Sequence, residues 1–159
     1  MKHKTIEISY TEYDSIAELT NGDAILLRKA REASKNSWAP YSNFHVGAAV
    51  LLENGEIITG NNQENVAYPS GLCAERVALF SANANFPGSP VKAIAVSAFN
   101  QNGLTNEPVK PCGACLQAIL ESETRFKTPV RLILDGSASI MVIDGMTNLL
   151  PFSFVNENL

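Results

Sequence analysis

Three cysteines, Cys73, Cys112 and Cys115, are the only thiols in this chain of 159 residues. A catalytic zinc ion takes three ligands from the protein and keeps the fourth position of its tetrahedron for water, and three thiolates meet that number. Glu75 follows Cys73 by two residues, so a carboxylate would stand beside the metal without being needed as a ligand. Such a group can carry protons. The spacing therefore predicts one zinc ion per chain, with Glu75 as a proton carrier.

Two other interpretations of the cysteines are open from spacing alone. They could hold a structural zinc ion, or they could be ordinary buried thiols. A structural site needs a fourth ligand, and neither His3 nor His45 stands at ligand spacing from a cysteine. The catalytic interpretation is therefore the stronger one.

The predicted zinc site requires two helix starts. Pro111 precedes the Cys112-x-x-Cys115 run, which suits the first turn of a helix, where the two side chains point the same way and free backbone N–H groups favour thiolates. We predict helices over residues 73–84 and 112–122. If both begin at a cysteine, two helix N-termini face one ion.

The remaining elements are expected to form a sheet that carries these helices. Residues 21–35 have helical spacing, and Asn54-Gly55 between the apolar runs 44–52 and 56–60 is a strong hairpin signal. Residues 91–99, 129–135 and 139–144 are predicted strands, and residues 5–10 alternate like a short edge strand. This order predicts an α/β fold with a mixed sheet of about five strands and helices packed on it.

Composition limits the partners. The net charge is -4 and no block of lysine or arginine occurs, so tight binding to a nucleic acid backbone is disfavoured. No apolar run approaches the ~20 residues that span a bilayer, and we expect neither a membrane segment nor a signal peptide. An odd number of cysteines argues for reduced, metal-binding thiols, so we expect a cytoplasmic location.

Over residues 25–154 the chain resembles the cytidine deaminases of the small, tetrameric, three-cysteine type. Five motifs carry the resemblance, in this order: APYSNFHVGAA (39–49), GNNQENVAY (60–68), CAER (73–76), PCGAC (111–115) and LLPFSF (149–154). The resemblance implies a three-layer α/β/α fold and places the catalytic domain at residues 21–159, after an N-terminal extension of residues 1–20.

The resemblance also implies a reaction. Zinc-activated water attacks C4 of cytosine and ammonia leaves, so that cytidine and deoxycytidine become uridine and deoxyuridine in pyrimidine salvage. Glu75 passes the water proton to N3 and then helps to protonate the departing amino group. The preference between the two nucleosides stays open.

The substrate residues come from the same resemblance. It implies that Asn62 and Glu64 hold the ribose 3′-hydroxyl, that Phe44 stacks on the pyrimidine, and that Ala74 offers its backbone N–H to the base carbonyl. From composition alone, residues 61–65 could equally be a solvated loop, and Phe44 on a strand is more often part of the core.

Charge compensation at the metal should come from Arg76. Three thiolates leave a zinc cluster with a net negative charge, which weakens the ion as a Lewis acid, and Arg76 lies one turn from Cys73. The alternative is a surface arginine. Relatives commonly carry arginine directly after the second cysteine of the Cys-x-x-Cys run, where this chain has Leu116, so more weight falls on Arg76.

The apolar C-terminal run, residues 149–154, should be docked on the protein. The resemblance implies a homotetramer with shared active sites in which Phe154 reaches a neighbouring subunit; packing within one chain is the alternative. Two alternative functions agree less well with the sequence. Deaminases of other aminated heterocycles fit Asn62 and Glu64 less well, and a non-enzymatic zinc-stabilised assembly protein would have no use for Glu75.

Overall fold

The computed structural model describes residues 1–155, and within them the chain forms one mixed sheet of seven strands. Five strands are long: β2 (His45–Leu52), β3 (Ile57–Asn61), β4 (Val91–Asn100), β6 (Arg131–Leu134) and β7 (Ile140–Asp144). Two are short: β1 (Thr11–Tyr13) and β5 (Gly103–Leu104). The helices are α1 (Asn21–Ser34), α2 (Ala74–Asn85) and α3 (Gly113–Phe126), with single 3-10 turns η1 (Ile16–Glu18), η2 (Tyr68–Ser70) and η3 (Met146–Asn148).

The strands lie in the order β1-β7-β6-β4-β2-β3, and β5 pairs with β4. Only β4 and β6 run parallel among the paired strands of residues 1–155. The five predicted strands and the 53–55 hairpin are confirmed. The expected count of about five was low, because it left out the short strands β1 and β5.

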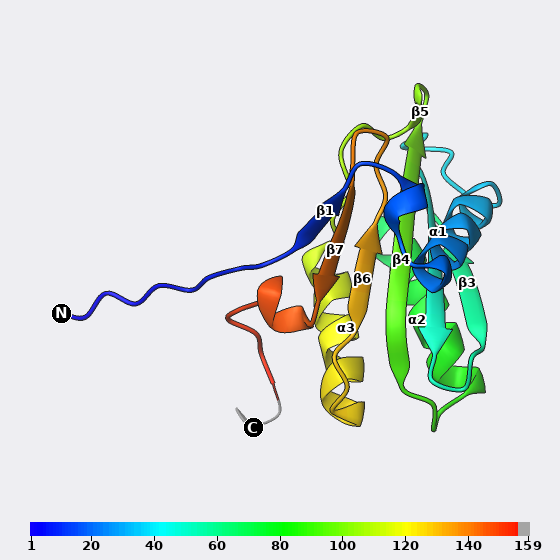
Figure 1. The fold of residues 1–159 in the computed structure, drawn as a ribbon. Helices are drawn as coiled ribbons and strands as arrows, with labels where there is room; N and C mark the ends of the chain where they lie inside the picture. The colour runs from blue at the N-terminus through cyan, green and yellow to red at the C-terminus, as the bar shows by residue number, and fades with distance from the viewer. Residues whose placement is uncertain (156–159) are drawn as a thin grey trace.

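The strand predicted at residues 5–10 is wrong in position, because the strand is formed by the next three residues. In the register of β1 and β7, Thr11 lies opposite Val142, so Ser9 would lie opposite Asp144, the last residue of β7. Residues before Ser9 have therefore passed the end of the only strand beside them. They run away from the body of the molecule (Figure 1).

Helices cover both faces of the sheet, so the three-layer α/β/α prediction is confirmed. Helix α1 covers one face, and α2 and α3 cover the other (Figure 1). Side chains alternate between the two cores: Val50, Ile94 and Leu132 face α2 and α3, whereas their neighbours Ala49, Ala95 and Ile133 face α1. This alternation follows from the period of two in a strand.

Two glycines let helices come close to the sheet. A Cβ at Gly47 would lie 2.0 Å from the carbonyl oxygen of Ala30 in α1. A Cβ at Gly60 would lie 2.4 Å from the backbone nitrogen of Ala78 in α2. Because α2 begins beside Cys73, the contact at Gly60 also sets where the predicted metal site lies.

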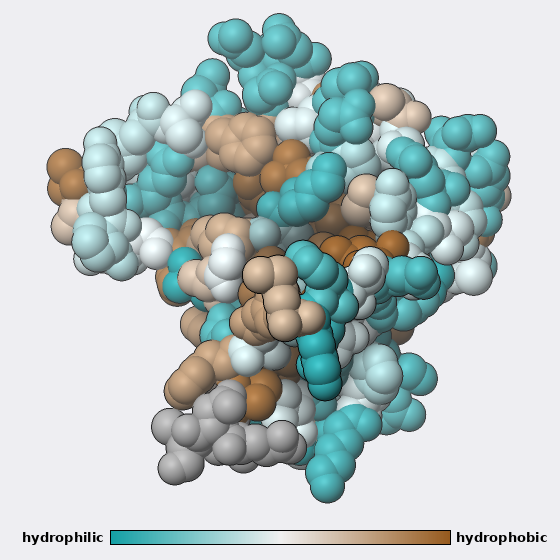
Figure 2. Space-filling model, turned by 90° about the vertical axis from the view of Figure 1, so that its left-hand side faces the viewer, coloured by the Kyte–Doolittle hydropathy of each residue, from teal (hydrophilic) through white to brown (hydrophobic). Residues whose placement is uncertain are grey.

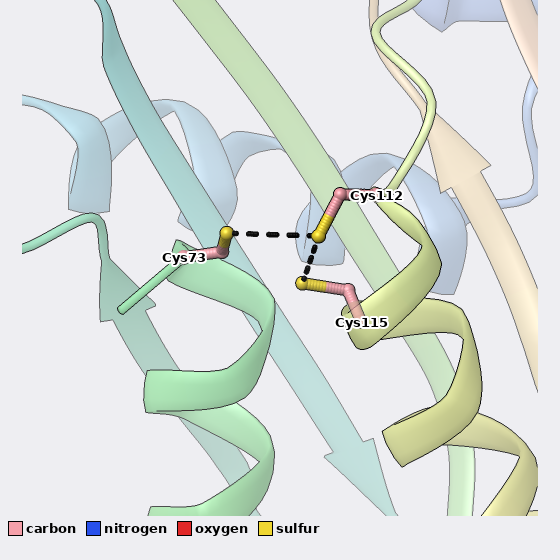
Figure 3. A group of neighbouring side chains, drawn as sticks. All are labelled: Cys73, Cys112 and Cys115. Carbon is pink, nitrogen blue, oxygen red and sulfur yellow. Dashed lines mark hydrogen bonds between the residues drawn. The ribbon is translucent and has the colours of Figure 1, made fainter. Parts of the chain in front are cut away.

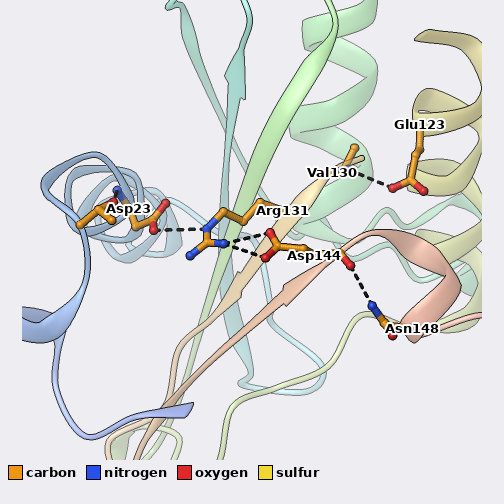
Figure 4. A network of polar contacts seen from close by, with 7 residues as sticks. Asp23, Glu123, Val130, Arg131, Asp144 and Asn148 are labelled. Atoms are coloured by element: carbon orange, nitrogen blue, oxygen red, sulfur yellow. Dashed lines mark hydrogen bonds and ion pairs between the residues drawn. The ribbon is translucent and has the colours of Figure 1, made fainter. Parts of the chain in front are cut away.

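Charged side chains join α1 and α3 to the sheet near β6 and β7 (Figure 4). Arg131 of β6 donates to both carboxylate oxygens of Asp144, at 2.9 Å each, and to Asp23 of α1 at 3.2 Å. Glu123 of α3 accepts the backbone N–H groups of Val130 and Met146, which anchors α3 to the start of β6 and to η3.

No helix within residues 1–155 is both long enough and apolar enough to cross a bilayer.

Candidate metal centre and active site

The three cysteines converge at the N-termini of two helices. Cys73 is the N-cap of α2, Cys112 is the N-cap of α3, and Cys115 lies in the first turn of α3. Their side chains point toward one another (Figure 3), with 3.9 Å between the sulfurs of Cys73 and Cys112 and 3.5 Å between those of Cys112 and Cys115. The prediction that both helices begin at a cysteine is confirmed.

The geometry of the cluster fits one zinc ion. All three sulfurs lie within 4.8 Å of one another, and tetrahedral zinc with Zn–S bonds of about 2.3 Å needs sulfurs about 3.8 Å apart. Within residues 1–155 the group consists of these three cysteines. Three protein ligands and one remaining position are the pattern of a catalytic zinc site.

The electrostatics of the cluster favour a thiolate at Cys73. Its sulfur accepts hydrogen bonds from Cys115 and, at 3.9 Å, from the Nη2 atom of Arg76, and these lower the pKa of Cys73 to about 5. Pairing with Cys73 and burial raise the pKa of Cys115. The thiolate is the form that binds metals, and the Nη2 atom of Arg76 points at the cluster.

Glu75 is the second residue of α2 and only 5% exposed. Burial raises the pKa of its carboxyl group, and the nearby Cys73 adds to the rise. The group therefore holds a proton at a higher pH than an exposed glutamate, which suits a residue that exchanges protons.

A cavity of about 440 Å³ brings most of the predicted site residues together. It is lined by Phe44, Asn62, Glu64, Cys73, Ala74, Glu75 and Cys112, and also by Ser42, Val46, Val96, Val109 and Lys110. Sequence reasoning had not singled out the last five. Ser42 and Val46 lie in the motif at 39–49, and Lys110 directly precedes the one at 111–115, so closeness to a motif was the available signal.

Asn62 fixes the start of β2 and Phe44, the residue directly before it. Its side-chain nitrogen donates to the carbonyl of Phe44 at 2.8 Å, and its side-chain oxygen accepts the N–H of Val46 at 2.8 Å. One N–H of the amide is therefore used, and the second is available for another partner. Residues 61–65 are thus more than a solvated loop.

Glu64 holds the turn that precedes β2. Its carboxylate accepts the backbone N–H groups of Tyr41 at 2.9 Å and Ser42 at 3.2 Å, and also the Ser42 hydroxyl. These bonds, the one from the Ser42 hydroxyl foremost, lower the pKa of Glu64 and keep it ionised.

A second hollow, of about 570 Å³, adjoins the first and shares Ser42, Asn62, Glu64 and Cys73 with it. Its rim carries Tyr41 and Tyr68, whose rings meet edge to face with 6.2 Å between centroids. The smaller cavity is the better candidate for the reaction, because Glu75 lines it and does not line the larger one.

Phe154 and Leu116 lie outside the cavity. Phe154 is 62% exposed, and only its carbonyl is bound, by the side chain of Gln117 at 2.9 Å. Leu116 is half-buried against the α2/α3 core, together with Leu149 and Leu150 of the apolar tail. Within one chain the structure therefore docks the start of the tail but does not bring Phe154 to the site.

A sheet covered by helices on both faces, with three cysteines at two helix N-termini beside a buried glutamate, is the architecture of a zinc-binding deaminase. Comparison with known proteins agrees. The family model for the cytidine and deoxycytidylate deaminase zinc-binding region matches residues 20–128. The chain belongs to this family.

Cytidine deaminases are among the relatives, and the chain matches them over most of their length. The chain is 41% identical to the cytidine deaminase of Sporosarcina psychrophila over 135 residues, which cover 84% of this chain and 92% of the relative. It is 44% identical to that of Halalkalibacterium halodurans over 97 residues, covering 61% and 69%. The crystal structure of the Burkholderia pseudomallei enzyme superposes with a TM-score of 0.72 at 36% identity, covering 86% of this chain and all of that one.

Proposed function

We propose that this protein is a cytidine deaminase that converts cytidine and deoxycytidine to uridine and deoxyuridine. The observation that carries the proposal is one cavity that joins Glu75 and two of the cysteines to Phe44 and Asn62. The relatives that bear the name cytidine deaminase support the same reaction.

Cys73, Cys112 and Cys115 would hold the zinc ion. When bound, the ion supplies a Lewis acid that makes water available as a nucleophile near neutral pH. Glu75 takes a proton from the attacking water and delivers it to N3 of the base. It then returns a proton to the amino group, which leaves C4 as ammonia while the C4 oxygen becomes a carbonyl. The burial that raises the pKa of Glu75 supports this exchange.

The base would lie between Phe44 and the first turn of α2. Phe44 stacks on the pyrimidine ring, and the backbone N–H of Ala74 donates to the base carbonyl. The first N–H groups of a helix have no partner within the helix, and Ala74 opens α2 at the wall of the cavity. The ring is thereby directed toward Glu75.

The ribose would be held by Asn62 and Glu64. The ionised Glu64 accepts a hydrogen bond from the 3′-hydroxyl, and the second N–H of Asn62 donates one. Both side chains are already fixed by hydrogen bonds, Glu64 to the turn before β2 and Asn62 to Phe44 and Val46, so little ordering is needed when the substrate binds.

Arg76 would offset the negative charge of the three thiolates. Its contact with the Cys73 sulfur supports this role, and Leu116, half-buried in the core, carries no charge that could share it.

The catalytic domain would comprise residues 21–159, and the protein would act in pyrimidine salvage in the cytoplasm. We expect a homotetramer with shared active sites, in which Phe154 closes the site of a neighbouring subunit. The exposure of Phe154 in a single chain supports this placement.

The decisive experiment is ammonia release from cytidine by the zinc-loaded protein, run beside Glu75→Ala. We expect rapid release by the parent protein and a loss of about 10²–10⁴-fold in the variant at equal zinc content. No release by a parent protein that holds one zinc ion per chain would reject the nucleoside. Activity in Glu75→Ala equal to that of the parent would reject Glu75 as the proton carrier.

A further inference from the structure

The segment before β1 contributes no residue to the proposed active-site cavity. The family match begins at residue 20, and residues 1–10 are exposed and form no helix or strand. They nevertheless carry three large apolar side chains, Ile6, Ile8 and Tyr10, which are 49%, 54% and 53% exposed. Apolar side chains that recur at every second residue are typical of a strand that packs against something.

The part of the chain that the structure describes offers this segment no strand. Within residues 1–155, β1 lies at the edge of the sheet and pairs on one side only, with β7. Residues before Ser9 lie beyond the end of β7. The segment projects from the side of the molecule seen face-on in Figure 2, where brown apolar residues are scattered among teal polar ones. Among the described residues, therefore, no strand lies where this segment could pair with it.

The segment is complementary to itself. In an extended chain every second side chain points the same way. One such side carries two bases, then three apolar groups, then two acids, in this order: Lys2, Lys4, Ile6, Ile8, Tyr10, Glu12 and Asp14. An antiparallel copy reverses the order, so that its acids meet the bases.

We infer that residues 2–14 pair antiparallel with the same segment of a second copy, about a twofold axis at Ile8. Ile8 then faces Ile8, and Ile6 faces Tyr10. Lys4 faces Glu12, and Lys2 faces Asp14. A twofold contact of this kind is self-complementary, as closed dimers require.

Neighbouring registers are poorer. An axis at Glu7 places two identical carboxylates opposite each other, and like charges directly opposite are unfavourable. An axis at Ser9 places Ile6 against Glu12. The axis at Ile8 alone among the three matches apolar groups with apolar groups and charges with opposite charges.

The same pairing protects the edge of the sheet. Residues 3–5 of one copy lie along the outer side of β1 of the other, opposite residues 11–13. The unpaired backbone groups of this edge strand then find partners, and the two sheets join through β1.

Truncation tests the interaction directly. We place this pairing between separate assemblies of the domain, so the full chain, examined by light scattering after gel filtration, should have at least twice the mass of a variant that lacks residues 1–10. Ammonia release per chain should be equal in both. Equal masses would overturn the inference and assign the segment to a different partner or to its own chain.

Charge reversal tests the register. Lys4→Glu alone and Glu12→Lys alone should each weaken the association by roughly tenfold, because two symmetry-related pairs become repulsive. The double variant Lys4→Glu/Glu12→Lys restores opposite charges and should associate like the parent. A double variant no better than either single one would contradict the pairing of these residues.

Cross-linking tests the axis. Under mild oxidation Ile8→Cys should form a covalent dimer, because directly opposite residues lie within disulfide range. The matched control is Ser9→Cys, whose counterpart in the second copy is a diagonal neighbour beyond that range. Oxidation of the parent protein shows how much cross-linking its own three cysteines cause. Equal cross-linking of the two variants would refute an axis at Ile8.

Discussion

The hydroxyl of Ser42 donates a hydrogen bond to the carboxylate of Glu64, 22 residues further along the chain. The same hydroxyl accepts the backbone N–H of Phe44 at 3.1 Å. One small side chain thus links the carboxylate proposed to hold the ribose with the aromatic ring proposed to hold the base.

Replacing Ser42 should therefore weaken substrate binding more than chemistry. We expect Ser42→Ala to raise KM for cytidine roughly tenfold and to change kcat little, since loss of one bond to a charged group misplaces both partners. Ser42→Thr keeps the hydroxyl and is the control. A fall in kcat at unchanged KM would place Ser42 in the chemistry instead.

The same bond sets a pH dependence. The bond lowers the pKa of Glu64. The contribution of the ionised carboxylate to the stability of the folded protein is therefore complete above the ordinary glutamate pKa of about 4.3. It is lost only as the pH falls through the lower pKa of the folded state. In Ser42→Ala this loss should move to higher pH. Carboxyl NMR titration of Glu64 in both proteins measures it, and identical titration curves would rule out the hydroxyl as the cause.

Arg76 should matter for metal affinity. We expect Arg76→Ala to bind zinc about 10–100-fold more weakly, because the charge beside the Cys73 sulfur is lost. Arg125→Ala is a suitable control, since Arg125 lies on α3 and donates to the carbonyl of Pro87, away from the cysteines. Competition with a chromophoric chelator measures both. Equal zinc affinities in the two variants would mean that the helix N-termini alone compensate the charge of the thiolates.

Gly60 should be intolerant of any side chain. The Cβ of Gly60→Ala would meet the backbone of α2 at 2.4 Å, so the helix must move and Cys73 with it. We expect a loss of about 2–3 kcal/mol in the free energy of unfolding. Gly88→Ala, which meets nothing within 4 Å, should be nearly neutral. Urea unfolding of both proteins compares them, and similar stabilities would show that the helix can adjust.

Phe154 should act only within an assembly. We expect Phe154→Ala to raise KM for cytidine about tenfold, whereas Phe152→Ala, at a residue 87% exposed and two positions away, should have little effect. A truncation after Pro151 should weaken activity and assembly together. An active monomer without the tail would reject the shared site.

Much of the fold was predictable because its signals are local. The local signals are the apolar runs at residues 44–52 and 91–99, the Asn54-Gly55 turn and the helix starts at Cys73 and Cys112, and each depends on neighbours a few residues apart. The edge strand was misplaced because its position depends on where β7 ends. Alternation in residues 5–10 marks a strand but does not say with what it pairs.

The site shows the same division. The residue types and spacing at 73–76 and 111–115 were enough to predict three sulfur ligands and a carboxylate, because zinc chemistry needs those groups in any fold. Tertiary structure alone showed the bonds of Asn62 to the start of β2, those of Glu64 to the turn before it, and the place of Ser42 between Glu64 and Phe44. Residues a few positions apart are held near each other by the backbone, so their sequence order is enough to predict their arrangement. A contact between Ser42 and Glu64, or between the sulfurs of Cys73 and Cys112, exists only after the sheet has brought distant segments together.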